Sequence, residues 1–362
     1  MGKGQKRIFV AMSGGVDSSV AAALLKESGH EVTGVFIKGW YPEWLPCNWR
    51  EERRDAMRVA TRLSIPFETF DCEDAYKKNV ADYMIAEYQT GRTPNPDVVC
   101  NKTIKFGAFF DEALRCGANM IATGHYARLR QAKSKNKNQK VKIELLTGVD
   151  ENKDQSYFLW ALSQKVLGRT FFPVGDYTKP EVRTIARRFG LPTAEKKESQ
   201  GLCFLGHVDV HEFLGHYTTI VQGDVLDTSG RVIGKHKGAI VYTLGQRHGF
   251  TITSQRSDEG KHYVVAKDMR RNTITVSERL QEEHAVSEVA LAEANWIGAE
   301  PRVGMSYMAR FRYRQKLQRC TIIEAAAAGA RIRFDTVQTA VSPGQSLVLY
   351  DGEVCLGGGV IV

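Results

Sequence analysis

The segment from Ile8 to Ser19 constrains the fold of this chain more than any other. Residues 8–12 are apolar and predict a buried strand, and the small residues 13–15 then interrupt the run. Apolar side chains recur with helical spacing from Val20 to Leu25, which predicts a helix directly after the break. A strand, a glycine loop and a helix N-terminus together make an anion site, because free N–H groups and the helix dipole face the same point.

The sequence of this loop, S-G-G-V-D-S-S at residues 13–19, resembles the PP-loop of ATP pyrophosphatases. It fits neither the P-loop pattern nor the dinucleotide-binding glycine pattern. The resemblance implies that ATP is cleaved between its α and β phosphates and that a substrate is adenylated. It also implies a role for Asp17 in binding magnesium. An ordinary strand-to-helix turn is the alternative reading of the same residues.

Strands and helices alternate over the first 200 residues. Further strands are predicted at 31–37, 65–70 and 119–123, with helices over 50–63 and 106–115. In the first of these helices, Met57, Ala60 and Leu63 are expected on the buried side. This rhythm predicts a doubly wound parallel sheet, in which ligands bind at the carboxyl ends of the strands. The loops after Met12, Ile37 and Thr123 should therefore meet in one crevice.

Residues 91–102 carry a second group of chemical side chains. Pro94 and Pro96 are separated by one residue, which predicts a stiff loop without regular helix. Asp97 and Cys100 would be held on this loop or just beyond it. A fixed acid and thiol suit nucleophilic chemistry, and a cation such as Lys102 would lower the thiol pKa. A rigid surface turn with an incidental cysteine is the alternative.

Two further features follow the strand that ends near Thr123. His125 lies at its carboxyl end, where it can contact phosphate or a base or serve a structural purpose. Residues 131–142 form a polar insertion rich in Lys, Asn and Gln. A solvated hairpin is expected there, with loose phosphate contact as the alternative.

The pattern changes after residue 206. Short β-branched runs between turn signals predict a small β-rich unit, and alternating strands predict a β-barrel after it. We expect domains at 1–206, 207–281 and 282–362. Arg310, Arg312 and Arg314 alternate with aromatic residues and would share one face of a strand. That face predicts a nucleic-acid surface, with a merely solvated face as the alternative.

Composition narrows the class of protein. The formal net charge is +9 and the pI about 9.1, which favours a polyanionic partner. The seven cysteines include no C-x-x-C pair, which argues against a closed zinc site or a disulfide framework. No apolar run is long enough to span a bilayer, and no signal peptide is recognisable. A cytoplasmic enzyme without membrane contact is expected.

Several motifs in order resemble the tRNA-specific 2-thiouridylase family from end to end. After the PP-loop come P-N-P-D-x-x-C-N, A-T-G-H-Y, K-D-Q-S-Y-F-L, S-x-G-x-C-F, T-L-G-Q-R-x-G, R-Y-R-Q, P-G-Q and G-E-V-C-L-G-G-G. The chain departs from the family at Ile37, where Met is frequent, and in its basic insertion at 131–142. A main-chain contact to adenine would survive the change at Ile37.

The resemblance implies a reaction and a set of site residues. ATP and Mg²⁺ would activate the wobble uridine of Lys, Glu and Gln tRNAs as an adenylate, after the base flips out of its stack. Sulfur would arrive as a persulfide on Cys203 from a cysteine desulfurase or a sulfur-relay carrier. Cys100 would assist the transfer and close a transient Cys100–Cys203 disulfide, with Asp97 as general acid/base. The implied ATP-binding residues are Ala11, Met12, Ser13, Gly14, Gly15, Val16, Asp17, Ser18, Ile37 and Gly124. The implied tRNA-binding residues are Asn95, Pro96, Asp97, His125, Lys153, Asp154, Gln155, Arg312, Tyr313 and Gln345.

Two other functions fit parts of the sequence. A PP-loop ligase or amidotransferase would share the ATP loop, but it would not need the two cysteines and the basic barrel. A non-catalytic RNA-binding redox protein would not need the intact PP-loop. A measurement of pyrophosphate exchange into ATP would distinguish such a non-catalytic protein from an enzyme.

Overall fold

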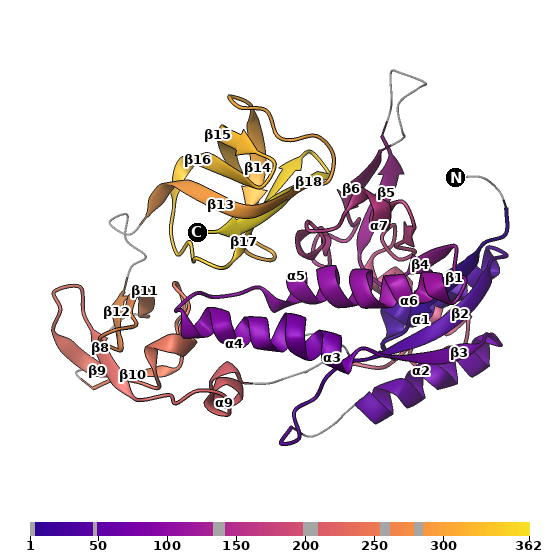
Figure 1. Ribbon diagram of the computed structural model, residues 1–362, viewed down its shortest axis with the longest axis horizontal. Coiled ribbons are helices and arrows are strands. Elements are labelled where there is room, and N and C mark those ends of the chain that lie inside the picture. Colours follow the sequence, from indigo (N-terminus) through magenta and orange to yellow (C-terminus); the bar gives the residue numbers. More distant parts are fainter. Residues whose placement is uncertain (1–3, 46–48, 133–141, 198–208, 254–260, 279–284) are drawn as a thin grey trace.

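A computed structural model describes residues 4–45, 49–132, 142–197, 209–253, 261–278 and 285–362 (Figure 1). Cys47, Cys203 and the centre of the 131–142 insertion lie outside these ranges. The chain forms a parallel sheet with flanking helices, a small β-sheet and a β-barrel. In Figure 1 the barrel lies above the long helices, and the small sheet lies beside α4. The predicted fold class is confirmed.

The parallel sheet has the strand order β3-β2-β1-β4-β7. Its strands are β1 (Arg7–Ala11), β2 (Glu31–Lys38), β3 (Phe67–Asp71), β4 (Met120–Ala122) and β7 (Thr170–Phe171). The central strand β1 is buried on both faces, as a strand covered by two helical layers must be. Because β1 lies between β2 and β4, the loops that follow these three strands share one edge of the sheet, as predicted.

Alternate residues of β1 belong to different hydrophobic clusters. Ile8 and Val10 pack with α1 (Val16–Glu27), α2 (Trp49–Leu63) and α8 (Lys179–Arg188). Phe9 packs on the other face with a second helical layer. That layer contains α3 (Glu73–Tyr76), η1 (Lys77–Ala81), α4 (Asp82–Gln89), α5 (Pro96–Cys100), η2 (Asn101–Ala108) and α6 (Phe109–Arg115).

Two of these helices differ from the sequence-based expectation. In α2 the buried residues are Ala56, Val59, Ala60 and Leu63, whereas Met57 is exposed. The helical run that was expected from Phe106 begins ten residues earlier, at Pro96, and continues through α5, η2 and α6. The expectation of a non-helical loop around Asp97 was therefore wrong. A proline at the first helical position is compatible with a helix, because its missing N–H would have no partner inside the helix.

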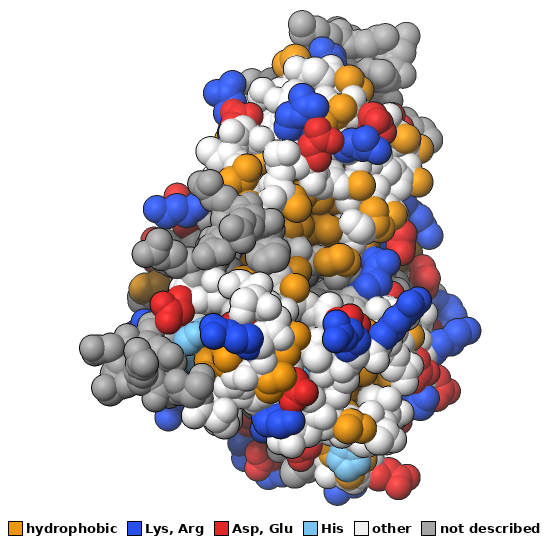
Figure 2. Space-filling view, turned by 90° about the vertical axis from the view of Figure 1, so that its left-hand side faces the viewer, with side chains coloured by type: hydrophobic (Ala, Val, Ile, Leu, Met, Phe, Trp, Pro, Cys, Tyr) orange, Lys and Arg blue, Asp and Glu red, His pale blue; other side chains and the backbone are white. Residues whose placement is uncertain are grey.

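The central unit contains a five-stranded sheet of order β10-β9-β8-β12-β11. Its strands are β8 (Gly223–Leu226), β9 (Val232–His236), β10 (Phe250–Ile252), β11 (Tyr263–Asp268) and β12 (Thr273–Ser277). The short helices α9 (Val210–Gly215) and η4 (Ala239–Val241) accompany this sheet. Figure 2 views the molecule from the side of this unit, and basic and acidic side chains are interspersed over the face.

The C-terminal strands close into a barrel. The order β13-β16-β15-β14-β17-β18 is completed by pairing between β13 and β18. The strands are β13 (Val286–Trp296), β14 (Ser306–Arg310), β15 (Gln318–Ala326), β16 (Gly329–Gln338), β17 (Ser346–Asp351) and β18 (Val354–Ile361). The hairpin β5 (Ala127–Gln131) and β6 (Ile143–Thr147) extends the barrel sheet, since β6 pairs with β18.

Three short elements complete the first part of the chain: η3 (Ser156–Phe158), α7 (Gln164–Leu167) and the strand β7.

Two side-chain amides, one from the first part of the chain and one from the barrel, form hydrogen bonds across the contact between them. Gln164 donates to the carbonyl of Ile297, and Asn295 donates to the carbonyls of Trp160 and Leu162. No helix among the described residues is both long and apolar enough to cross a membrane.

Candidate active site

The loop between β1 and α1 depends on Gly14. Its φ is +75°, a left-handed conformation that favours glycine, and a Cβ there would lie 2.3 Å from the carbonyl oxygen of Glu52. Gly15 then occupies the cap position of α1. Its carbonyl accepts from Ser18 Oγ at 3.2 Å and Ser19 Oγ at 2.7 Å. The loop therefore presents the first-turn N–H groups of α1, which have no partner within the helix, at the carboxyl edge of the sheet.

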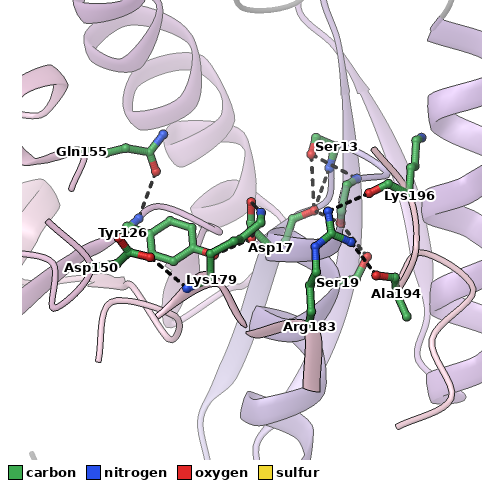
Figure 3. A network of polar contacts seen from close by, with 12 residues as sticks. Ser13, Asp17, Ser19, Tyr126, Asp150, Gln155, Lys179, Arg183, Ala194 and Lys196 are labelled. Carbon is green, nitrogen blue, oxygen red and sulfur yellow. Dashed lines mark hydrogen bonds and ion pairs between the residues drawn. The ribbon is translucent and has the colours of Figure 1, made fainter. Parts of the chain in front are cut away.

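Asp17 in the first turn of α1 is tied to residues that the sequence did not single out. Lys179 Nζ lies 2.7 and 2.8 Å from its two carboxylate oxygens, and Tyr126 donates its hydroxyl to one of them at 2.7 Å (Figure 3). Lys179 opens α8, where Thr178 and Glu181 form a capping box. The T-x-x-E spacing at 178–181 is the signal that could have predicted a second helix N-terminus in this part of the chain.

The loop after β4 packs directly onto α1. A Cβ on Gly124 would lie 2.5 Å from the backbone nitrogen of Ser18, so only glycine fits. Ile37, at the end of the neighbouring strand, is buried beneath the same edge. For the loop at Gly124, the predicted convergence is a close backbone contact with the start of α1.

His125 is buried among aromatic rings rather than exposed at the edge. Its ring lies 5.7 Å from Phe106 and 6.1 Å from Phe172, and its Nδ1 shares a 2.7 Å hydrogen bond with Thr123 Oγ1. Burial, with a smaller effect of Lys105, holds the pKa of His125 well below 6.5. The imidazole is therefore neutral at physiological pH and cannot supply a positive charge to a thiolate or a phosphate.

Asp97 and Cys100 lie in the first turns of the helical run that begins at Pro96. Asn95 caps this run, its side chain accepting from the backbone N–H of Val98. Asp97 is half-buried, whereas Cys100 is completely buried in the core. Lys102, which was considered as an activating cation, is exposed. The acid and the thiol are thus fixed by a helix rather than by a stiff loop.

A chain of contacts connects this helix to the loop between β1 and α1. Asp97 and Cys100 share their helical run with Phe106, and the ring of Phe106 lies 5.7 Å from that of His125. His125 follows Gly124, which packs on α1.

 The loop between β1 and α1 and the acid–thiol pair are therefore linked by a chain of contacts, although they pack in different hydrophobic clusters. Cys203, the other predicted thiol, lies outside the described residues.

The residues just before this helix meet the other two parts of the chain. Thr93 shares a hydroxyl hydrogen bond of 3.2 Å with Thr243 of the central unit. Gln345 Nε2, from the barrel, donates to the carbonyls of Thr93 and Pro94 at 2.9 and 3.0 Å. Arg312 links the barrel to the central unit by donating to the carbonyls of Leu244 at 2.6 Å and Ala340 at 2.8 Å.

Tyr157 contacts both the barrel and the cap residue Asn95 at this junction. Its hydroxyl donates to the carbonyls of Phe311 at 3.1 Å and Ser346 at 2.9 Å, and it also interacts with the side chain of Asn95. Burial raises the pKa of Tyr157 above its usual range, so the hydroxyl stays protonated. The K-D-Q-S-Y-F-L, R-Y-R-Q and P-G-Q motifs thus meet at the start of the Cys100 helix.

The predicted arginine face does not exist in the structure. Strand β14 ends at Arg310, and residues 311–314 form a bend and turn, so the three side chains do not share a strand face. Arg310 is buried and ion-paired with the buried carboxylate of Asp154. Arg312 is turned into the domain junction, and Arg314 alone is exposed. The alternation of charged and aromatic residues was misleading because the strand stops after the first arginine.

The remaining residues implied as tRNA contacts lie in different surroundings. Asp154 is buried and accepts from the backbone N–H groups of Gly148 and Ser156. Gln155 is paired with the backbone of Tyr126 through its side chain and its own N–H. Lys153 is partly exposed, as is Tyr313, whose ring packs 4.7 Å from that of Phe158. Their contact with tRNA stays a prediction.

The fold and the loop geometry define a class of protein: a nucleotide-binding α/β domain of the PP-loop type with two appended β units. Sequence profiles divide the chain in the same order. The tRNA methyl transferase HUP domain matches residues 6–207, the tRNA methyl transferase PRC-barrel domain matches 211–278, and the aminomethyltransferase beta-barrel domain matches 286–361.

Curated relatives identify the family within this class. The tRNA-specific 2-thiouridylase MnmA of Acidovorax ebreus (strain TPSY) is 45% identical over 366 residues, covering 98% of this chain and 98% of the relative. The protein of the same name from Pseudomonas putida (strain GB-1) is 46% identical over 364 residues, covering 98% and 94%. This chain belongs to the tRNA-specific 2-thiouridylase MnmA family.

Proposed function

We propose that this chain is a tRNA-uridine 2-sulfurtransferase that replaces O2 of the wobble uridine with sulfur at the expense of ATP. Lys, Glu and Gln tRNAs are the expected substrates. One observation carries the proposal: the helix that bears Asp97 and Cys100 starts where all three parts of the chain meet. The same helix packs, through Phe106 and His125, toward the N-terminus of α1.

The α1 N-terminus provides the ATP site in this proposal. The loop from Ala11 to Ser18 offers backbone N–H groups to the phosphates, and Ile37 and Gly124 border the nucleotide. Asp17 fits a magnesium site, because Mg²⁺ is usually held by one or two carboxylates together with substrate phosphates. Its present partner Lys179 would then contact a phosphate oxygen in place of the carboxylate.

The two thiols carry sulfur to the activated base. Uridine O2 attacks the α phosphorus and pyrophosphate leaves. The terminal sulfur of a Cys203 persulfide then attacks C2, and AMP departs with the former O2. The Cys100 thiolate attacks Sγ of Cys203, which breaks the persulfide bond, leaves sulfur on C2 and forms a Cys100–Cys203 disulfide. A dithiol reductant restores both cysteines, and Asp97 transfers protons at the base.

The proposal has three further requirements. The wobble base must leave its stack, because a stacked base cannot present C2 to enclosed side chains. Cys100 is completely buried, so its surroundings must open during the cycle. The sulfur comes from a persulfide donor, either a cysteine desulfurase or a sulfur-relay carrier. We propose that the reaction takes place in the cytoplasm.

The test is a reconstituted reaction with ATP, unmodified tRNA and a labelled persulfide donor. The wild type should form AMP, pyrophosphate and 2-thiouridine, the last measured by mass spectrometry of tRNA nucleosides. Cys100→Ser should retain labelled sulfur on the protein, Cys203→Ser should not, and neither should thiolate tRNA. Cys116→Ser is the matched control, because Cys116 lies just beyond α6 at the end of the same helical run and should not affect turnover.

Two outcomes would contradict the proposal. AMP formation without sulfur in tRNA would favour a PP-loop ligase or amidotransferase. Thiolation that persists in Cys100→Ser or Cys203→Ser would remove that cysteine from the mechanism.

A further inference from the structure

We propose that Gln345 is a positioning residue, which sets the place of the helix that carries Asp97 and Cys100. Its relevance to catalysis rests on the proposed function, whereas the contact itself does not. The barrel residue lies far from these two side chains in sequence, and its partner Thr93 is 252 positions away.

The barrel holds Gln345 rigidly at the base of its side chain. The backbone N–H of Gln345 donates to the carbonyl of Ser342 at 3.2 Å, which closes a tight turn. Its carbonyl accepts from the N–H of Ile361 at 2.8 Å, and the N–H of Gly344 donates to the carbonyl of Ile361 at 2.9 Å. The turn is therefore fastened to the end of β18.

The side chain of Gln345 is directed at the segment before the helix. Its Nε2 donates to two consecutive carbonyls, those of Thr93 and Pro94. An amide nitrogen carries two hydrogens, so these bonds use its full donor capacity. In the opposite direction, the N–H of Thr93 donates to the carbonyl of Pro343 at 2.9 Å. A contact of this amide with tRNA would have to use the remaining carbonyl oxygen.

Gly344 makes this approach of the two backbones possible. Its φ is +91°, and a Cβ there would lie 2.8 Å from the carbonyl oxygen of Thr93. The P-G-Q motif thus supplies a close backbone approach at its glycine and a double donor at its glutamine. We call Pro343–Gln345 together with Thr93–Pro94 the barrel clamp.

The barrel clamp acts immediately before the helix cap. Asn95 follows Pro94 and caps α5, and Pro96 fixes the first helical φ. Two prolines within three residues leave few free torsions between the clamped carbonyls and the helix. A displacement of Thr93 and Pro94 is therefore passed on to Asp97 and Cys100, which lie in the first turns of the run.

The test compares Gln345→Met, which keeps side-chain volume but lacks donors, with Gln338→Ala. Gln338 is a suitable control because it is buried in the same barrel and donates to the carbonyl and hydroxyl of Thr336, within its own strand. Hydrogen exchange of the 93–100 backbone is measured in both variants. kcat for thiolation, KM for tRNA and the tRNA dissociation constant are measured in parallel.

A positioning role predicts a distinctive set of results. In Gln345→Met, exchange within 93–100 should quicken at least tenfold, and kcat should fall by about a hundredfold, the cost of a misplacement of roughly 1 Å. KM and the dissociation constant for tRNA should stay within about twofold. Gln345→Ala should behave in the same way, and Gln338→Ala should resemble the wild type in every measurement.

Three results would overturn the inference. Unchanged exchange in 93–100 would show that the barrel clamp does not order the segment. Faster exchange with unchanged kcat would show that the order does not matter for catalysis. A raised KM with kcat retained would make Gln345 a tRNA contact. If the wild type itself does not thiolate tRNA, the proposed function fails, while the exchange measurement still decides whether the clamp orders the helix.

Discussion

Asp17 and Lys179 form an ion pair at the point where an ATP phosphate would arrive. Asp17→Ala should abolish AMP formation but leave tRNA binding nearly intact, because it removes the carboxylate proposed to hold magnesium beside the ATP phosphates. Lys179→Met should also remove most of the activity, since it deletes the cation at the same place. Lys235→Met, which breaks an exposed pair with Asp224, is the control. AMP formation by Asp17→Ala at the wild-type rate would refute the assignment.

The pair Arg310–Asp154 has a structural role that the sequence did not suggest. Both side chains are buried, so removing one partner leaves an uncompensated charge in the core. Arg310→Met should lower the free energy of unfolding by about 3–5 kcal/mol, measured by urea denaturation. Arg314→Met, at the exposed arginine nearby, should change it by less than about 0.5 kcal/mol. Equal effects of the two substitutions would contradict this reading.

His125 should make the stability of the protein depend on pH below neutrality. Burial holds the folded-state pKa well below 6.5, so the unfolded chain takes up the proton first as the pH falls. The stability contributed by the neutral ring is complete above about pH 6.5 and is lost progressively below it. His125→Phe keeps a ring among Phe106 and Phe172 but cannot titrate.

The measurement is the unfolding free energy of both proteins between pH 5 and 8. The difference between wild type and His125→Phe should change in this range, with the wild type losing stability more steeply on acidification. Parallel curves would mean that His125 titrates alike in the folded and unfolded chains.

At the scale of the elements, the contact of the β4 loop with α1 leaves no room for an added methyl group. Gly124→Ala places a Cβ 2.5 Å from the nitrogen of Ser18, which cannot give way without moving the first turn of α1. We expect AMP formation to fall by about a hundredfold, with a matching loss of ATP affinity. Gly298→Ala is the control, because nothing lies within 4 Å of its added Cβ. Full activity in Gly124→Ala would show that the loop is not part of the ATP site.

The sequence predicted the parallel sheet well because its strands are short apolar runs that alternate with helical patterns. Such runs can be recognised without knowing which strands pair. It misjudged the start of the Cys100 helix, since Pro96 was treated as a helix breaker although a first-turn proline with an Asn cap is a helix start. It also missed Lys179 and Tyr126 as partners of Asp17. Those contacts join residues 162 and 109 positions apart, which no local pattern can reveal.

At the scale of the whole molecule, three successive units were predictable from changes in periodicity, but their junction was not. Gln345 and Arg312 were expected to face tRNA, and the structure shows both bonded to backbone carbonyls between units. Residues 131–142 were expected to form a solvated hairpin; most of them lie outside the described residues, and the flanking strands β5 and β6 extend the barrel sheet through β18. Long-range pairing of this kind depends on tertiary packing rather than on the composition of the hairpin.

The pairing of β6 with β18 has a consequence for how the protein is made. Arg128 in the hairpin and Glu353 beside β18 are 225 residues apart in sequence, and their contact cannot form until the later segment has left the ribosome. The same holds for the barrel clamp on Thr93 and Pro94. During synthesis the α/β domain can collapse early, but the start of the Cys100 helix acquires its final restraints only near the end of translation. The position of Cys100 in a nascent chain would therefore become fixed only after the barrel has closed.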